Sequence, residues 1–515
     1  MGIELDGMSL TPETAVAASR FFQGVVVSES SLKAVQENWE MLQGLLAEGK
    51  VMYGVNTGIG AFGNEIISSE EGAELSKRMV RSHACGVGDP LPEDEARACM
   101  LLRANVLAKG YSGVRPSTLL ALVALLNKRV TPVIYEKGSV GTSGDLAPLA
   151  QMALVLIGEG EAFFQGKRMP GSEVLEQAGL TPVDLQAREG LALFNGAQAM
   201  TAIGALALYD AEQLLKSAQI AAALTIDVLN TVTAAFDARL HALRPFRGQN
   251  DVATNLRYLI QDSEVLEQEK TDTQSAYSLR CVPQVLGASA DALAYVRENL
   301  CIEMNSAADN PLFITKDKEY IAGGNFHGQP IAYAMDLLGI AVSEIGNMAE
   351  RRVNRLLNPA LNGGLPAFLI KSGAGLNSGL MITQYTAAAL ASENKILASP
   401  ASVDSIPCSA DQEDHVSMGT IGARKAREIV RNVERIVAIE LLCAAQAYEF
   451  RKPLKLGVGT RIAYDELRKA SPVVEDDREF YRDIEAVARL VRSGEIVRRV
   501  EKKVKLSRNG CVDLT

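Results

Sequence analysis

The chain has 515 residues, 47% hydrophobic and 22% charged, which is typical of soluble globular proteins and excludes a disordered or fibrous chain. Its formal net charge of -10 argues against a nucleic-acid or acidic-membrane partner, because binding phosphate needs a basic face. The seven cysteines are scattered without a C-x-x-C pair, and the chain shows neither a signal peptide nor a long apolar run. We therefore expect a cytoplasmic protein with reduced thiols.

The first 190 residues carry most of the turn-rich segments, and loops of this kind often carry chemistry. These segments are YGVNTGIGAFGN (53–64), GVGDPLPEDE (86–95), GYSGVRPS (110–117) and EKGSVGTSGDLAP (136–148). A short strand pair is expected near Val51–Tyr53 and Val133–Tyr135, with little sheet elsewhere.

The remaining residues, 191–515, contain long stretches without proline or glycine. Residues 205–244 permit a helix of roughly 40 residues, and residues 380–399, stopped by Pro400, and 423–452 permit two more. Their apolar residues lie all around the helix, which indicates burial on several sides and association of subunits. A coiled coil or a helical solenoid is the competing interpretation, but neither sustained heptads nor an internal repeat is visible. The prediction is a mainly α protein, with a turn-rich part over 1–190 and a long-helix bundle over 191–515.

The loop Gly138-Ser-Val-Gly-Thr-Ser-Gly-Asp145 has several interpretations when it is considered alone. A phosphate cradle would need a Gly-Lys-Ser/Thr ending, which is missing. A serine nucleophile would need a G-x-S-x-G elbow and a histidine base, and none of the four histidines is obviously placed as one. A plain glycine-rich turn is the default. Residues 53–63 resemble a dinucleotide-binding loop in sequence. The alternating strands and helices of a Rossmann unit do not follow them, which argues against that interpretation.

Six blocks in order along the chain resemble the ammonia-lyases that use a methylidene-imidazolone group, and most closely the histidine ammonia-lyases. They begin at residues 53, 138, 194, 277, 324 and 412, and read YGVNTG, GSVGTSGDLAPLA, FNG, YSLRC, GNFHG and QEDHVS. The resemblance implies a fumarase/aspartase-like helical architecture and a homotetramer whose active sites combine residues from several subunits.

The resemblance also implies a prosthetic group made from Thr142, Ser143 and Gly144. The Gly144 nitrogen attacks the Thr142 carbonyl, two waters leave, and Ser143 becomes an exposed methylidene. Ordinary side chains supply no strong electrophile, and expelling ammonia beside an unacidic β-proton needs one. Most of the family has Ala at position 142, but ring closure uses only the backbone carbonyl there. No metal or external cofactor is required, since no histidine or cysteine spacing fits a zinc site.

Further residue roles follow from the same resemblance. Tyr53 takes the β-proton, which requires its phenol pKa to fall well below its ordinary value. Arg280 binds the substrate carboxylate in a bidentate pair, and Asn195 helps to place the carboxylate or the amine. The family's remaining pocket positions correspond to Gln274, Tyr277 and Phe326.

His83 and Glu413 are expected to decide the substrate, because a buried imidazole needs polar partners whereas a phenyl ring does not. The expected reaction is L-histidine to urocanate and ammonia. Alternatives on the same scaffold are a phenylalanine or tyrosine ammonia-lyase and a 2,3-aminomutase, and a non-catalytic helical scaffold is the alternative of another class. Two departures from the family pattern, Ile59 and Asp411, bear on the shape of the pocket.

Overall fold

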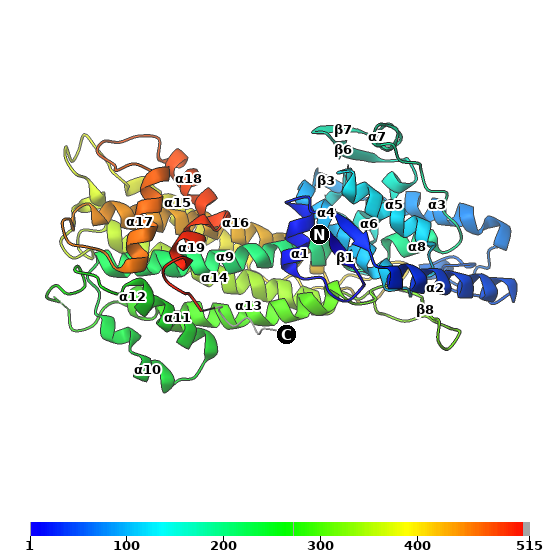
Figure 1. Ribbon diagram of the computed structural model, residues 1–515, viewed down its shortest axis with the longest axis horizontal. Helices are drawn as coiled ribbons and strands as arrows, with labels where there is room; N and C mark the ends of the chain where they lie inside the picture. Colours follow the sequence, from blue (N-terminus) through cyan, green and yellow to red (C-terminus); the bar gives the residue numbers. More distant parts are fainter. Residues whose placement is uncertain (1, 271, 508–515) are drawn as a thin grey trace. The chain divides into compact units, whose positions relative to one another are not determined.

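The computed structural model describes residues 2–270 and 272–507, which are mainly helical (Figure 1). They fold into two compact units, each built from non-contiguous segments. Unit 1 comprises Met1–Tyr209, Arg297–Asp336 and Pro400–Arg424, and unit 2 comprises Asp210–Val296, Leu337–Ser399 and Lys425–Thr515. The mainly helical fold expected from the sequence is confirmed, whereas the functional division near residue 190 stays a prediction.

Unit 1 holds most of the short helices and all the strands of the described residues. Its helices are α1 (Pro12–Ser19), α2 (Glu29–Ala47), α3 (Gly72–His83), α4 (Glu93–Ala108), α5 (Pro116–Asn127), α6 (Leu146–Leu156), α7 (Gly171–Ala178) and α8 (Glu189–Phe194). Its strands are β1 (Ile3–Leu5), β2 (Val25–Val27), β3 (Val87–Pro90), β4 (Thr131–Pro132), β5 (Tyr135–Lys137), β6 (Glu161–Phe164), β7 (Lys167–Pro170), β8 (Leu312–Ile314) and β9 (Glu319–Ile321).

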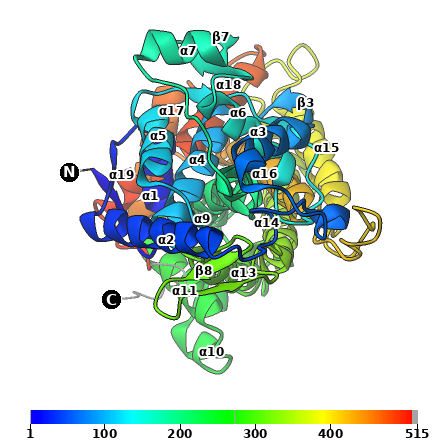
Figure 2. The same ribbon diagram turned by 90° about the vertical axis from the view of Figure 1, so that its right-hand side faces the viewer.

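The strands form small separate sheets. Strands β1 and β2 pair in parallel, β3 with β5 and β8 with β9 pair antiparallel, and β4, β6 and β7 make a three-stranded antiparallel sheet. Figure 2 shows the β6–β7 hairpin beside α7. None of these sheets is large enough to form the core, so the core is built by helices.

Helix α4 is a long helix of unit 1 that is buried over most of its length. Every residue from Glu95 to Ala108 is buried, including Arg103 and Asn105. The three acidic residues of its first turn, Glu93 to Glu95, match the partial positive charge at a helix N-terminus. A charged residue on a buried helix needs a partner that neutralises its charge. Arg103 has such a partner in Asp309.

The remaining helices are the long helices and the shorter helices of unit 2. The helices are α9 (Gln198–Val228), α10 (Ala238–Ala242), α11 (Arg247–Leu259), α12 (Tyr277–Arg280), α13 (Val282–Met304), α14 (Gln329–Leu357), α15 (Met381–Leu397), α16 (Gly419–Tyr448), α17 (Val458–Ala470), α18 (Phe480–Arg492) and α19 (Glu495–Glu501). Helix α15 fills the stretch predicted before Pro400, and α16 begins a turn earlier than the stretch predicted from residue 423.

Two local predictions were wrong. The stretch 205–244 does not form one helix: α9 starts earlier, at Gln198, and ends at Val228. Asn230 then adopts a left-handed conformation (φ 50°) and its side chain donates to the Glu269 carbonyl, which turns the chain away. Residues 51–53 are not a strand either, because the Asn56 side chain accepts a hydrogen bond from Met52 N and donates to Lys50 O, which closes a turn.

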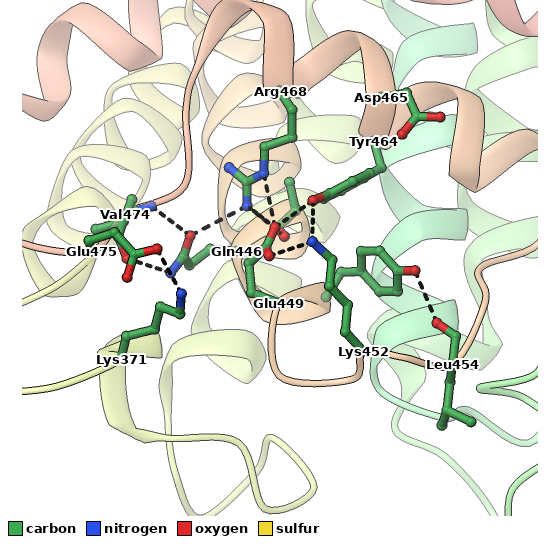
Figure 3. A network of polar contacts seen from close by, with 12 residues as sticks. Lys371, Gln446, Glu449, Lys452, Leu454, Tyr464, Asp465, Arg468, Val474 and Glu475 are labelled. Carbon is green, nitrogen blue, oxygen red and sulfur yellow. Dashed lines mark hydrogen bonds and ion pairs between the residues drawn. The ribbon is translucent and has the colours of Figure 1, made fainter.

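A polar network in unit 2 fixes the chain between α16 and α17 (Figure 3). Glu449 accepts hydrogen bonds from the Tyr464 hydroxyl (2.6 Å), Lys452 Nζ (2.7 Å) and Arg468 Nη2 (3.0 Å). The Tyr448 hydroxyl donates to the Leu454 carbonyl at 3.0 Å. The segment 449–454 is therefore held by side chains of both helices.

Candidate active site

The loop between β5 and α6 is shaped by a backbone contact that only glycine permits. Gly144 has φ 77° and pairs with Gly196, and a Cβ at Gly144 would lie 2.2 Å from the Gly196 carbonyl carbon. Asp145 N donates to Gly196 O (2.7 Å), and Gly196 N donates to Ser143 O (3.1 Å). The backbone of residues 143–145 is thus clamped along residue 196, with the Ser143 side chain half-buried.

The Asp145 side chain holds this loop in place through hydrogen bonds. Its buried carboxylate accepts hydrogen bonds from Ser139 Oγ (2.7 Å), Met200 N (2.8 Å) and Thr420 Oγ1. Burial raises the pKa of Asp145 above its ordinary value, while these hydrogen bonds act in the opposite direction. The loop is therefore bound to the first turns of both α9 and α16.

A cavity of about 460 Å³ opens in front of Ser143, within unit 1. Five of the residues predicted from the sequence line it together: Tyr53, His83, Ser143, Asn195 and Glu413. The other lining residues are Gly58, Ile59, Gly60, Phe62, Leu75, Arg78, Met79, Ser82, Leu146, Leu191, Asn310 and Ser409. The volume suits a small organic molecule.

Glu413 contacts the loop from the cavity side. Ser143 Oγ donates to Glu413 Oε1 at 3.2 Å. Glu413 and Cys408 exchange both backbone hydrogen bonds, which closes the loop between them, and residues 409–411 within it have positive φ values. This strained turn places the carboxylate at the cavity wall. Of the two departures from the family pattern, Ile59 lines the cavity, whereas Asp411 is exposed.

His83 ends α3 and lines the cavity. Its Nδ1 lies 2.8 Å from the Met79 carbonyl, and its ring stacks on Phe194 with centroids 4.8 Å apart. A carbonyl can only accept, so Nδ1 carries the hydrogen and Nε2 is an acceptor in the neutral ring. Burial lowers the pKa of His83, against the opposing effects of the Met79 bond and the Glu413 charge, which favours that neutral form.

Tyr53 does not have the lowered pKa that its predicted role requires. Burial raises the pKa of the Tyr53 phenol, and the nearby Glu413 carboxylate adds to the rise. The hydrogen bond from Gly60 N to the phenol oxygen (2.8 Å) acts in the opposite direction. The charge of Arg188 also lowers this pKa, but burial outweighs it, so a phenolate at Tyr53 needs further stabilising charge.

Asn195 offers an unused acceptor. The residue is 2% exposed, its Nδ2 donates to Asn310 O (2.7 Å), and its Oδ1 has no hydrogen-bond partner. A buried carbonyl without a partner costs free energy, so it is commonly satisfied by a bound group. An amine in the cavity would supply that missing donor.

A buried ionic group lies next to Asn195, and it was not predicted from the sequence. Asp309 contacts Arg103 Nη2 (3.1 Å) and Arg188 Nη2 (2.8 Å), and all three side chains are fully buried. Arg103 also donates to the Asn195 carbonyl (2.7 Å), and Arg188 donates to the Asn310 carbonyl (3.2 Å). Arg103 interrupts an apolar helix sequence, which was a usable signal, whereas nothing in the sequence pointed to Arg188 or Asp309.

The other predicted site residues do not line this cavity. Thr142 and Gly144 are buried on either side of Ser143, and Phe326 is half-buried between β9 and α14. Gln274, Tyr277 and Arg280 belong to unit 2, in and just before α12. Tyr277 is 70% exposed there, with the Arg280 guanidinium 4.5 Å from the centre of its ring.

The described residues contain neither a cluster of metal-ligating side chains nor a helix suited to a membrane. No group of three or more His, Cys, Asp or Glu side chains among residues 2–270 and 272–507 has the arrangement of a metal site. Over the same residues, no helix is long and apolar enough to cross a membrane. The six described cysteines are free, and Cys511 lies outside the described residues.

The chain is similar to proteins of known family. The profile of the aromatic amino acid lyase family matches residues 10–469. The histidine ammonia-lyase of Alkaliphilus oremlandii is 54% identical over 98% of this chain and 99% of its own length. Among solved structures, tyrosine aminomutase from Streptomyces globisporus has a TM-score of 0.94 at 39% identity, covering 98% of this chain and 100% of that one. Histidine ammonia-lyase from Trypanosoma cruzi has a TM-score of 0.92 at 40% identity, covering 99% and 97%.

Proposed function

Because the chain belongs to the aromatic amino acid lyase family, and is thus a carbon-nitrogen lyase, we propose that it eliminates ammonia from L-histidine to give urocanate. The observation that carries the proposal is the cavity in which Ser143, His83 and Glu413 meet. The identity of 54% to a histidine ammonia-lyase exceeds the 39% to an aminomutase, which favours release of ammonia over its return to the substrate.

Thr142, Ser143 and Gly144 fit the formation of a methylidene-imidazolone. The loop is clamped along Gly196, so the bulk of any side chain is excluded at position 144, and Ser143 is the member of the triad that faces the cavity. The group supplies an electrophilic carbon that makes the substrate amine a better leaving group. The Thr142 side chain is not needed, because ring closure uses its backbone carbonyl alone.

The cavity supplies polar partners for an imidazole. A neutral substrate imidazole donates its one N–H to His83 Nε2, and a protonated ring also donates its second N–H to the Glu413 carboxylate. A phenyl ring would leave both groups without partners, at a cost for each. Asn195 Oδ1 receives the substrate ammonium.

Tyr53 removes the β-proton in this proposal, with help from another subunit. Burial raises the pKa of the Tyr53 phenol despite the Gly60 hydrogen bond and the charge of Arg188, so further compensating charge must come from elsewhere. We assign that charge to Arg280 of the partner subunit in a cytoplasmic homotetramer, where it also binds the substrate carboxylate through its planar guanidinium. The exposure of Tyr277 supports this assignment, because a 70% exposed aromatic next to an arginine suits a shared site.

Turnover of three amino acids tests the proposal. The purified protein is incubated separately with histidine, phenylalanine and tyrosine, and urocanate, the other aryl acrylates, β-amino acids and ammonia are quantified. We expect urocanate and ammonia in equal amounts from histidine. Cinnamate, coumarate or β-histidine as the main product would overturn it, and absence of all products together with an unmodified 142–144 peptide mass would indicate a non-catalytic scaffold.

A further inference from the structure

Arg188 is a fully buried arginine in a strained backbone conformation. It immediately precedes α8, its side chain is inaccessible to solvent, and its φ of 78° lies in the left-handed region. A residue with a side chain adopts this conformation at a cost in free energy, and residues strained in this way gather at functional sites. The contacts of the Arg188 guanidinium lead to the candidate active site.

The Arg188 guanidinium holds several backbone carbonyls at once. Its Nε donates to Ser112 O (3.1 Å), its Nη1 to Asn310 O (3.2 Å) and its Nη2 to Pro311 O (3.0 Å), and Nη2 also pairs with Asp309 Oδ2 (2.8 Å). Asp309 Oδ1 in turn accepts a hydrogen bond from Asn310 N (2.7 Å). The planar fork of a guanidinium fixes its acceptors in direction as well as distance. Arg188 therefore fixes the backbone of residues 309–311.

The Asn310 carbonyl also accepts a hydrogen bond from Asn195 Nδ2, at 2.7 Å. A carbonyl can only accept, so the NH₂ end of the Asn195 amide must face it, and Oδ1 lies at the other end. That Oδ1 is buried without a partner, and both asparagines line the cavity that contains Ser143. The position of the Asn310 carbonyl thus sets the direction of Asn195 Oδ1.

The ionic group that contains Arg188 has an excess of positive charge. Asp309 is shared by Arg188 and Arg103, and all three side chains are fully buried. Among the residues that the structure describes, neither guanidinium pairs with a second carboxylate, so the group carries one net positive charge. A buried charge is screened less by salt and water than an exposed one. The charge therefore reaches neighbouring groups at the cavity.

Tyr53 is such a neighbour. Burial raises the pKa of its phenol, the Gly60 N–H lowers it, the charges of Glu413 and Tyr320 raise it, and the charge of Arg188 lowers it. The other titratable side chains that line the cavity are Arg78 and His83. Arg188 is thus a cation within the same unit that favours the ionised form of Tyr53.

We propose that Arg188 is a positioning residue of the elimination: it fixes Asn195 through the Asn310 carbonyl so that Oδ1 meets the substrate amine, and its buried charge favours the Tyr53 phenolate. The proposal rests on the proposed function, which supplies the amine and the role of Tyr53. Arg188 acts through these residues and does not itself line the cavity.

Binding without turnover tests the positioning. Full-length Ser143→Ala protein is titrated by calorimetry with L-histidine and with imidazolepropionate, which has the same ring and carboxylate but no amine. Lysine keeps the charge of Arg188 but cannot hold the three carbonyls in their directions. Adding Arg188→Lys should weaken histidine binding about tenfold, the size of one hydrogen bond to a charged group, and should leave imidazolepropionate binding nearly unchanged.

The pH dependence of turnover, measured with Ser143 intact, tests the charge. In Arg188→Met the lost charge raises the pKa of Tyr53, so the phenolate disappears at a higher pH and the acid limb of kcat/KM should move upwards. Arg188→Lys keeps the charge and should leave that limb in place. If Arg188→Met does not fold, the ligand selectivity of Arg188→Lys decides the proposal.

Arg115→Lys is the matched control. Arg115 pairs with buried Glu189, the first residue of α8, but does not line the cavity. It should change neither the two affinities nor the acid limb.

Three results would overturn the proposal: equal losses for both ligands in Arg188→Lys, the same selective loss in Arg115→Lys, or an unmoved acid limb in folded Arg188→Met. With a wild type that still deaminates histidine, these results reject only the role of Arg188. A wild type that releases no ammonia from histidine rejects the proposed function instead.

Discussion

A Cβ on Gly144 would lie 2.2 Å from the carbonyl carbon of Gly196, so these two residues are in direct backbone contact. The contact joins the loop before α6 to the residues before α9, and the hydrogen bonds of Asp145 N and Gly196 N run along it. Any side chain at position 144 must push these backbones apart.

We therefore expect Gly144→Ala to abolish formation of the electrophile. The intact mass of the variant should lack the loss of two waters, and its ammonia release should fall to background. Gly166→Ala is the matched control, because Gly166 also has positive φ (76°) but no atom lies within 4 Å of its Cβ position. That control carries only the left-handed strain of about 1–2 kcal/mol. A dehydrated, active Gly144→Ala protein would contradict the role of the contact.

His83→Leu should shift the substrate preference from histidine towards phenylalanine. Removing the Nε2 acceptor leaves a histidine ring without one partner, so kcat/KM for histidine should fall by about 10- to 100-fold. The larger apolar surface should raise kcat/KM for phenylalanine, which is the internal control for folding. Equal losses on both substrates would show that His83 is only a packing residue against Phe194.

Tyr53→Phe should lower kcat by about 10²- to 10⁴-fold, the usual contribution of a positioned general base. Substrate KM should change little, because the ring remains. In the same variant, formation of the electrophile, followed by intact mass, should proceed normally. Loss of the dehydrated mass would place Tyr53 in ring formation and not in proton removal.

The pH profile tests how Tyr53 is ionised. Since its surroundings raise the pKa of Tyr53, the active phenolate is lost as the pH falls, and kcat/KM should decline on the acid side. Arg280→Gln should shift that acid limb to higher pH, whereas Arg280→Lys, which keeps the charge, should leave its position nearly unchanged. An acid limb that stays in place in Arg280→Gln would assign the compensating charge to another group.

Asp309→Asn should destabilise unit 1 strongly. It leaves the Arg103 and Arg188 guanidiniums buried without a counter-charge, and breaking a buried pair in this way costs about 3–5 kcal/mol. The midpoint of thermal unfolding should fall accordingly, with Asp237→Asn as a control at an exposed pair with Arg239. Equal midpoints for the two variants would show that the buried charges are compensated by other groups.

The parts of the site that local sequence specifies were predictable. The loop of residues 142–144 and its companion blocks predicted an electrophile and the residue types around it. The meeting of Tyr53, His83 and Glu413 at one cavity depends on how α3 and the loop after Pro400 fold, which no local pattern contains. Helix ends were less predictable, since α9 stops where Asn230 turns left-handed and not at a proline or glycine.

Two further features could not be predicted because they are interactions between distant segments. The Asn195 Nδ2 group donates to the carbonyl of the distant residue Asn310, and its Oδ1 has no partner. The ionic group of Arg103, Arg188 and Asp309 draws on three separate parts of the chain. The raised pKa of Tyr53, similarly, results from tertiary burial and the approach of Glu413.

The hydrogen bonds of Asp145 also explain how a fully buried carboxylate exists without a basic side chain paired to it among the described residues. Its Oδ2 accepts from Met200 N in the first turn of α9, and α6 begins at the next residue after it. Each helix start carries a partial positive charge of roughly half a unit, so the two together nearly balance one carboxylate. The loop before α6 is thus neutralised by main-chain dipoles, so the groups that hold it add no cation next to Ser143 that could compete for a carboxylate.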